Sequence, residues 1–82
     1  RLAACVSILG GIRSVYRWQG DVAEDRERQI VIKTTAVRLE PLMTRVRELH
    51  PYAVPELVAL PVVGGDAEYL RWLDESTAPD ET

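Results

Sequence analysis

The first 34 residues carry the side-chain patterns of β-strands, and this constrains the fold more than any other feature of the chain. Residues 4–9 alternate between two sets of side chains with a period of two, which is typical of a strand. Residues 12–19 and 29–34 are rich in β-branched and aromatic side chains and predict further strand. The whole region therefore predicts a long hairpin.

Glycines and acidic residues divide this β-rich region. Gly10-Gly11 is a turn or bulge signal, and Gly20 inside a strand pattern indicates a bulge or bend. The acidic stretch at residues 21–27 is expected to hold the tip of the hairpin, at Glu24-Asp25.

An amphipathic helix follows the hairpin. Its apolar side chains recur at the spacing of one helix face: Leu39, Leu42, Met43, Val46 and Leu49. Proline is tolerated in the first turn of a helix, so Pro41 predicts that this helix begins between Arg38 and Pro41. Pro51 is expected to end it and to bias His50 towards an extended conformation.

The last third of the chain predicts one more strand and a short helix. Residues 55–63 are rich in β-formers, and Pro61 within them indicates an edge position or a strand end. Asp66 is placed to cap a helix over residues 67–74, and the small, polar tail from Ser76 is expected to fray. The predicted order of strand, strand, strand, helix, strand and helix is typical of an antiparallel α+β domain.

Composition excludes several classes of protein. The chain has 82 residues, which is one small domain, and its 46% apolar and 28% charged residues argue against disorder. The net charge of −3 has the wrong sign for a protein that recognises nucleic acid by charge. No apolar run approaches the roughly 18 residues of a membrane span. The single cysteine excludes an internal disulfide framework and, without an export signal, predicts a cytoplasmic location.

Several segments, taken in chain order, resemble the divalent-cation tolerance family known as CutA. They lie at residues 1–6, 14–20, 32–34, 48–56, 60–62, 65–66 and 69–73. The most specific of them is His-Pro-Tyr-x-x-Pro-Glu at residues 50–56.

The resemblance implies a ferredoxin-like βαββαβ sandwich with an extra C-terminal helix, assembled as a cytoplasmic homotrimer. It also implies a role in divalent metal tolerance and in the response to metal ions, with copper binding. Family members begin with a strand and a long helix that precede the segment matching residues 1–6, so we expect this chain to lack the first strand and most of the first helix. Residues 1–76 would then be one incomplete CutA-like domain and residues 77–82 a disordered tail. Because its sheet edges would be exposed, the isolated 82-residue chain is not expected to form a well-behaved soluble trimer.

Two side chains are candidate metal ligands. His50 is the only histidine, and imidazole suits Cu(II) as well as other divalent cations. Cys5 is the only cysteine, and its thiolate would bind soft metals such as Cu(I). Each also has a purely structural interpretation, His50 as a helix-terminal hydrogen-bonding residue and Cys5 as a small core residue.

A second set of residues is predicted to line a ligand pocket between subunits or to form trimer contacts. These residues are Tyr16, Trp18, Lys33, Tyr52 and Trp72. The aromatic members would bury large areas in either role, and Lys33 would be either an anion anchor or a strand residue with its charge in solvent.

The sequence carries no catalytic motif, and we predict no enzymatic activity: it lacks a phosphate-binding glycine loop, a Ser-His-Asp order and zinc-ligand spacing. The alternative to the CutA-like function is a PII-like regulatory module that binds a small anionic ligand in a cleft between subunits. An enzyme that uses the same cleft is a third hypothesis. The predicted partner is a second copy of the chain, with no nucleic acid and no membrane.

Overall fold

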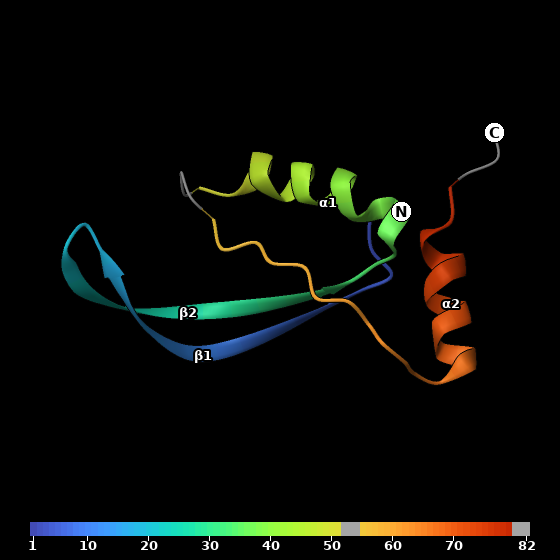
Figure 1. Ribbon diagram of the computed structural model, residues 1–82, viewed down its shortest axis with the longest axis horizontal. Coiled ribbons are helices and arrows are strands. Elements are labelled where there is room, and N and C mark those ends of the chain that lie inside the picture. The colour runs from blue at the N-terminus through green and yellow to red at the C-terminus, as the bar shows by residue number, and fades with distance from the viewer. Residues whose placement is uncertain (52–54, 80–82) are drawn as a thin grey trace.

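The computed structural model describes residues 1–51 and 55–79. It contains β1 (Cys5–Trp18), β2 (Asp21–Lys33), α1 (Ala36–Leu49) and α2 (Ala67–Thr77), in that order (Figure 1). The two strands form one antiparallel sheet, which confirms the predicted α+β class. The molecule is elongated, with extents of 48 × 28 × 20 Å, because the hairpin extends beyond the helices.

The hairpin turns at Gln19-Gly20. Pairing runs without interruption from Trp18 opposite Asp21 to Ile12 opposite Glu27, and Gln19 and Gly20 have φ angles of 50° and 86°. Positive φ at both central residues is the requirement of a type I′ turn, whose twist matches that of the strands. The prediction of a tip at Glu24-Asp25 is wrong, because both residues lie inside β2 and their side chains have partners on β1.

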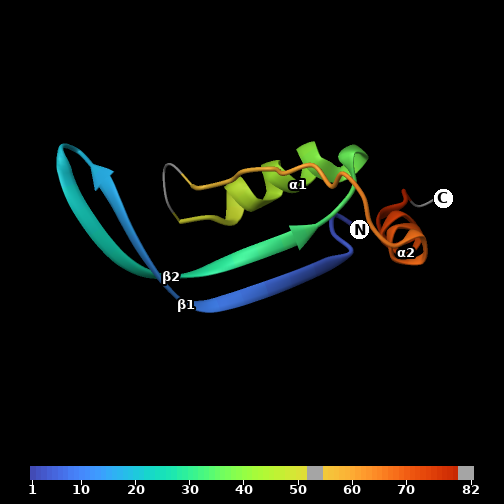
Figure 2. The ribbon, with the colours of Figure 1, turned by 60° about the horizontal axis from the view of Figure 1, so that its bottom comes forward.

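The predicted bulge at Gly10-Gly11 is confirmed. The pairing register shifts between Leu9 and Ile12, and Gly11 has a φ of 72°. The strands predicted at residues 4–9 and 12–19 are therefore one irregular strand, β1, which covers Cys5–Trp18. The hairpin curves towards the side on which α1 lies (Figure 2).

Helix α1 begins earlier than the sequence predicts. It starts at Ala36, so Pro41 lies inside the helix and cannot donate the backbone hydrogen bond that would reach the carbonyl of Val37. The predicted end is confirmed: His50 caps the helix with φ −80° and ψ 134°, an extended conformation.

The apolar stripe of α1 is turned towards the rest of the molecule. Leu39, Leu42, Met43 and Val46 are half-buried and face β2 and residues 56–62 across a groove, whereas Leu49 is 67% exposed. The helix and the extended segment that follows it lie on the same side of the sheet (Figure 2).

The strand predicted at residues 55–63 is absent from the structure, which describes all of these residues. They run extended beside α1, but the only sheet in the described chain contains β1 and β2. A strand requires a hydrogen-bonding neighbour, and the groove separates this segment from β2. Pro55 and Pro61 further remove two backbone donors.

The N-cap predicted at Asp66 is confirmed, since its carboxylate accepts a hydrogen bond from the backbone N–H of Tyr69 at 3.1 Å. Helix α2 then extends to Thr77, beyond the predicted end at residue 74. Neither helix in the described chain is long and apolar enough to cross a membrane.

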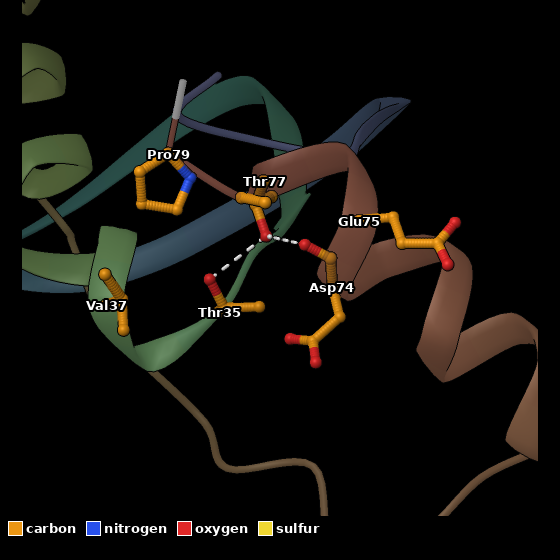
Figure 3. Close-up of a pocket in the computed structure, with 7 residues that line it drawn as sticks. Thr35, Val37, Asp74, Glu75, Thr77 and Pro79 are labelled. Atoms are coloured by element: carbon orange, nitrogen blue, oxygen red, sulfur yellow. Dashed lines mark hydrogen bonds between the residues drawn. The ribbon is translucent and has the colours of Figure 1, made fainter. Parts of the chain in front are cut away.

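Thr77 joins the end of α2 to the start of α1. It is 1% exposed, and its hydroxyl lies 3.1 Å from the hydroxyl of Thr35 and 3.3 Å from the carbonyl oxygen of Asp74 (Figure 3). The same hydroxyl donates to the carbonyl of Leu73 at 3.0 Å. Arg38 Nε donates to the carbonyl of Thr77 at 2.7 Å. The expected fraying from Ser76, and the expected tail from residue 77, are therefore wrong for Ser76 and Thr77; residues 80–82 lie outside the described chain.

Gly20→Ala should destabilise the protein by about 1–2 kcal/mol, because an L-residue is strained in the left-handed region. A Cβ at Gly20 would meet no atom within 4 Å, so the cost arises from the backbone and not from a clash. The matched control is Gly64→Ala, where the Cβ also meets nothing and φ is not in the left-handed region. Urea unfolding of the two variants measures the difference, and equal stability would contradict the type I′ turn.

Candidate functional site

His50 lies at the C-terminal end of α1, where its position follows from the Pro51 that ends the helix. Its backbone N–H donates to the carbonyl of Val46 at 2.9 Å, and the residue is half-buried. This backbone hydrogen bond matches the structural interpretation of His50 as a helix-terminal residue. A metal ion would be bound by the imidazole of the side chain.

Cys5 lies outside α1, on the side of the N-terminal end of this helix, whereas His50 lies at its C-terminal end. It is the first residue of β1, is half-buried, and pairs with Lys33 at the end of β2. Helix α1 starts three residues after Lys33, and a helix of 14 residues rises about 21 Å. Metal–ligand bonds are only about 2 Å long, so one chain cannot bring His50 and Cys5 to the same ion.

The described residues contain no group of three or more His, Cys, Asp or Glu side chains that could hold a metal ion. A site with His50 and two further ligands of these types would therefore need ligands from a second copy of the chain or from residues that the structure does not describe. The same holds for Cys5.

The residues predicted to share a pocket are dispersed in the described chain. Tyr16 and Trp18 lie near the tip of the hairpin, whereas Lys33 closes its other end. Trp72 lies on α2 and contacts Tyr69, with ring centroids 5.8 Å apart. Tyr52 lies outside the described residues. A cleft that uses several of these residues would have to form between copies.

A groove of about 1010 Å³ lies between β2, α1 and residues 56–62, and α2 closes one end. Its walls are aliphatic for most of their length, with Ile30 and Ile32 on the strand and Leu42 and Val46 on the helix. Lys33 lines the groove at the end of β2. This chemistry suits an apolar segment of polypeptide better than a small polar ligand.

A smaller hollow of about 390 Å³ lies where the two helices meet (Figure 3). Thr35 and Thr77 line it, but their hydroxyls hydrogen-bond to each other and Thr77 also donates to Leu73. Sequence reasoning missed these two residues. The available signal was a threonine immediately before a helical pattern, which is a preferred N-cap type, although Thr35 makes no side-chain cap hydrogen bond.

Comparison with known proteins gives a consistent result over nearly the whole chain. Residues 1–76 match the family described as CutA1 divalent ion tolerance protein. The divalent-cation tolerance protein CutA of Thermus thermophilus is 56% identical over 77 residues, covering 94% of this chain and 75% of that protein. The chloroplastic protein CutA of Arabidopsis thaliana is 52% identical over 77 residues, covering 94% of this chain and 42% of that protein.

Solved structures agree with the sequence matches. The Thermus thermophilus divalent cation tolerance protein superimposes with a TM-score of 0.91 at 55% identity, covering 95% of this chain and 76% of that one. CutA1 from Oryza sativa gives a TM-score of 0.91 at 48% identity, covering 96% and 72% of the two chains. These matches give no support to the PII-like alternative. The resemblance drawn from the sequence motifs is confirmed, and the chain belongs to the CutA1 divalent ion tolerance family.

Proposed function

We propose that the protein acts in divalent metal ion tolerance as a cytoplasmic homotrimer that binds copper through His50. The observation that carries this proposal is the 56% identity to a protein named divalent-cation tolerance protein CutA. The proposal assigns the chain no catalytic step. One relative is named as chloroplastic, and that name concerns the plant protein alone.

Exposed apolar side chains support the homotrimer. Leu73, which is 8% exposed, is the only buried hydrophobic side chain among the described residues. Large apolar side chains are exposed along the hairpin and along residues 58–63, among them Ile8 at 65%, Leu60 at 83% and Val63 at 98%. Exposed apolar surface of this extent is typical of a protein–protein interface.

The chemistry of the ligands supports copper. An imidazole binds Cu(II) more strongly than the other first-row divalent ions, and His50 is the only one in the chain. Cys5 is the candidate for Cu(I), which prefers thiolate. Other divalent cations remain candidates for the same histidine.

We also propose that the complete protein has the ferredoxin-like βαββαβ arrangement, with a strand in the groove between β2 and residues 56–62. The aliphatic walls of the groove and the extended course of residues 56–62 support this. The strand would come from outside the 82 residues, since the chain covers 76% of the Thermus thermophilus structure.

In the full-length protein, alternate backbone amides in residues 56–62 should exchange with solvent at least about a hundredfold more slowly than the amide of Gly64, because an adjacent strand would accept their hydrogen bonds. Hydrogen exchange followed by NMR measures this. Gly64 is an internal control in the exposed loop that follows. Exchange at the rate of Gly64 throughout residues 56–62 would contradict the strand.

His50→Ala should lower the affinity of the full-length protein for Cu(II) by at least about a hundredfold, since loss of an outer-shell partner alone costs up to that much. Calorimetric titration with Cu(II) measures the change. The control is Cys5→Ser, which removes the other candidate ligand at the opposite end of α1 and should leave Cu(II) binding intact. Unchanged affinity in His50→Ala would remove His50 from the metal site.

A further inference from the structure

Lys33 is the only positively charged residue that lines the groove between β2, α1 and residues 56–62. Glu56 is the only other charged residue in the lining, and most of the remaining side chains are aliphatic. Lys33 is the last residue of β2, so it lies at the end of the groove nearest α2 (Figure 1). This end of the groove therefore combines an ammonium group with apolar walls.

Lys33 is less exposed than the other cations of the hairpin. It is half-buried, whereas all four arginines of β1 and β2 are exposed: Arg13, Arg17, Arg26 and Arg28. Withdrawing an ammonium from water costs free energy unless an anion or several hydrogen-bond acceptors replace the lost hydration. The position of Lys33 therefore predicts a partner of this kind.

The described chain does not supply that partner. The ammonium of Lys33 makes no ion pair and no hydrogen bond to the described residues. The residue opposite it in the register is Cys5, and its neighbours on the same face of the hairpin are Ser7 and Val31. None of these three side chains carries a carboxylate.

Glu56 lies too far away to be the partner within one chain. It follows the C-terminal end of α1, in the segment that runs back beside the helix, whereas Lys33 precedes the N-terminal end (Figure 1). The helix between them has 14 residues and rises about 21 Å. The two charges that line the groove therefore stand apart.

We propose that Lys33 binds a carboxylate of the strand that fills the groove in the full-length protein. This inference rests on the strand proposed above, which lies outside the 82 residues. A strand in the groove would remove still more water from Lys33. A carboxylate on that strand would replace the water with a charge-assisted hydrogen bond.

The groove favours a side chain of that strand over a free acid. A small carboxylic acid bound at Lys33 would leave most of the aliphatic wall of this groove of about 1010 Å³ uncovered. A strand would cover the wall with apolar side chains and would bring its carboxylate to one end only. One acidic side chain next to Lys33 therefore satisfies both the charge and the apolar surface.

Lys33→Met in the full-length protein tests the pair, because methionine keeps an unbranched side chain and removes the charge. The matched control is Arg71→Met, which removes a positive charge from an exposed residue of α2. Lys33→Arg keeps the charge and should retain most of the stability. Urea unfolding of the variants is compared at one protein concentration over a range of pH.

At about pH 7, Lys33→Met should lower the equilibrium constant for folding at least about tenfold relative to Arg71→Met, because the carboxylate loses its partner. A paired carboxylate contributes stability that is lost as the pH falls and the group becomes protonated. The difference between the two variants should therefore diminish below about pH 4. A packing role of the side chain alone would give a difference that does not depend on pH.

A measurement on the wild type identifies the partner even where Lys33→Met fails to fold. Nuclear Overhauser effects should connect the Cε protons of Lys33 with the side-chain methylene protons of an aspartate or glutamate in the strand. Hydrogen exchange of the amides in residues 56–62 reports separately whether the strand is present.

The outcomes separate this inference from the proposed strand. Equal stability of Lys33→Met and the control, or a difference that is constant with pH, would overturn the pair. Slow exchange in residues 56–62 would then leave the strand standing, and fast exchange would overturn the strand as well.

Two other partners would also overturn the pair. Nuclear Overhauser effects from Lys33 to Glu56 of another copy would assign the lysine to a contact between copies, and the effect of Lys33→Met should then vanish in a Glu56→Gln background. Stabilisation of the wild type by added acetate, abolished by Lys33→Met and without contacts to an acidic side chain, would assign Lys33 to a small carboxylic acid.

Discussion

The chain cannot bury its own apolar surface, and the rest of the structure follows from that constraint. Among the described residues, Leu73 is the sole buried hydrophobic side chain, while aliphatic residues of both strands and of residues 58–63 are exposed. What holds the elements together is mainly the backbone ladder of the hairpin and a small polar junction around Thr77. Hydrophobic burial is normally the dominant favourable term in folding, so a stable form needs further polypeptide on these surfaces.

The candidate site residues are spread apart in the described chain. His50 and Cys5 lie at opposite ends of α1, and Tyr16 and Lys33 lie at opposite ends of the hairpin. In the homotrimer proposed above, residues that are spread over this elongated molecule would come together where copies meet. The groove beside β2 is a separate surface, and its aliphatic walls suit an apolar strand.

Local signals in the sequence predicted local structure. The glycine pair at the bulge, the apolar stripe of α1 and the cap at Asp66 each depend on residues close in sequence, and each is confirmed. The tip of the hairpin was misplaced because composition favoured the acidic stretch, whereas the positive φ values at Gln19-Gly20 decide the turn. The prediction of a strand at residues 55–63 was wrong because a strand needs a hydrogen-bonding neighbour, and the β-propensity of the residues does not supply one. The role of Thr77 could not be predicted, since its partners Thr35 and Arg38 are distant in sequence.

For the candidate site, the sequence indicates that His50 and Cys5 are residues of types that bind metal ions. Whether the two side chains meet at one ion depends on assembly.

The dependence of thermal stability on protein concentration tests the central claim most directly. If folding and assembly are coupled, the unfolding midpoint of the full-length protein should rise as protein concentration increases, and the species that unfolds should have the mass of an oligomer. Calorimetry over a hundredfold range of concentration, with the mass measured by light scattering, would show this. A concentration-independent midpoint for a monomer would contradict the claim that other copies cover part of the exposed apolar surface.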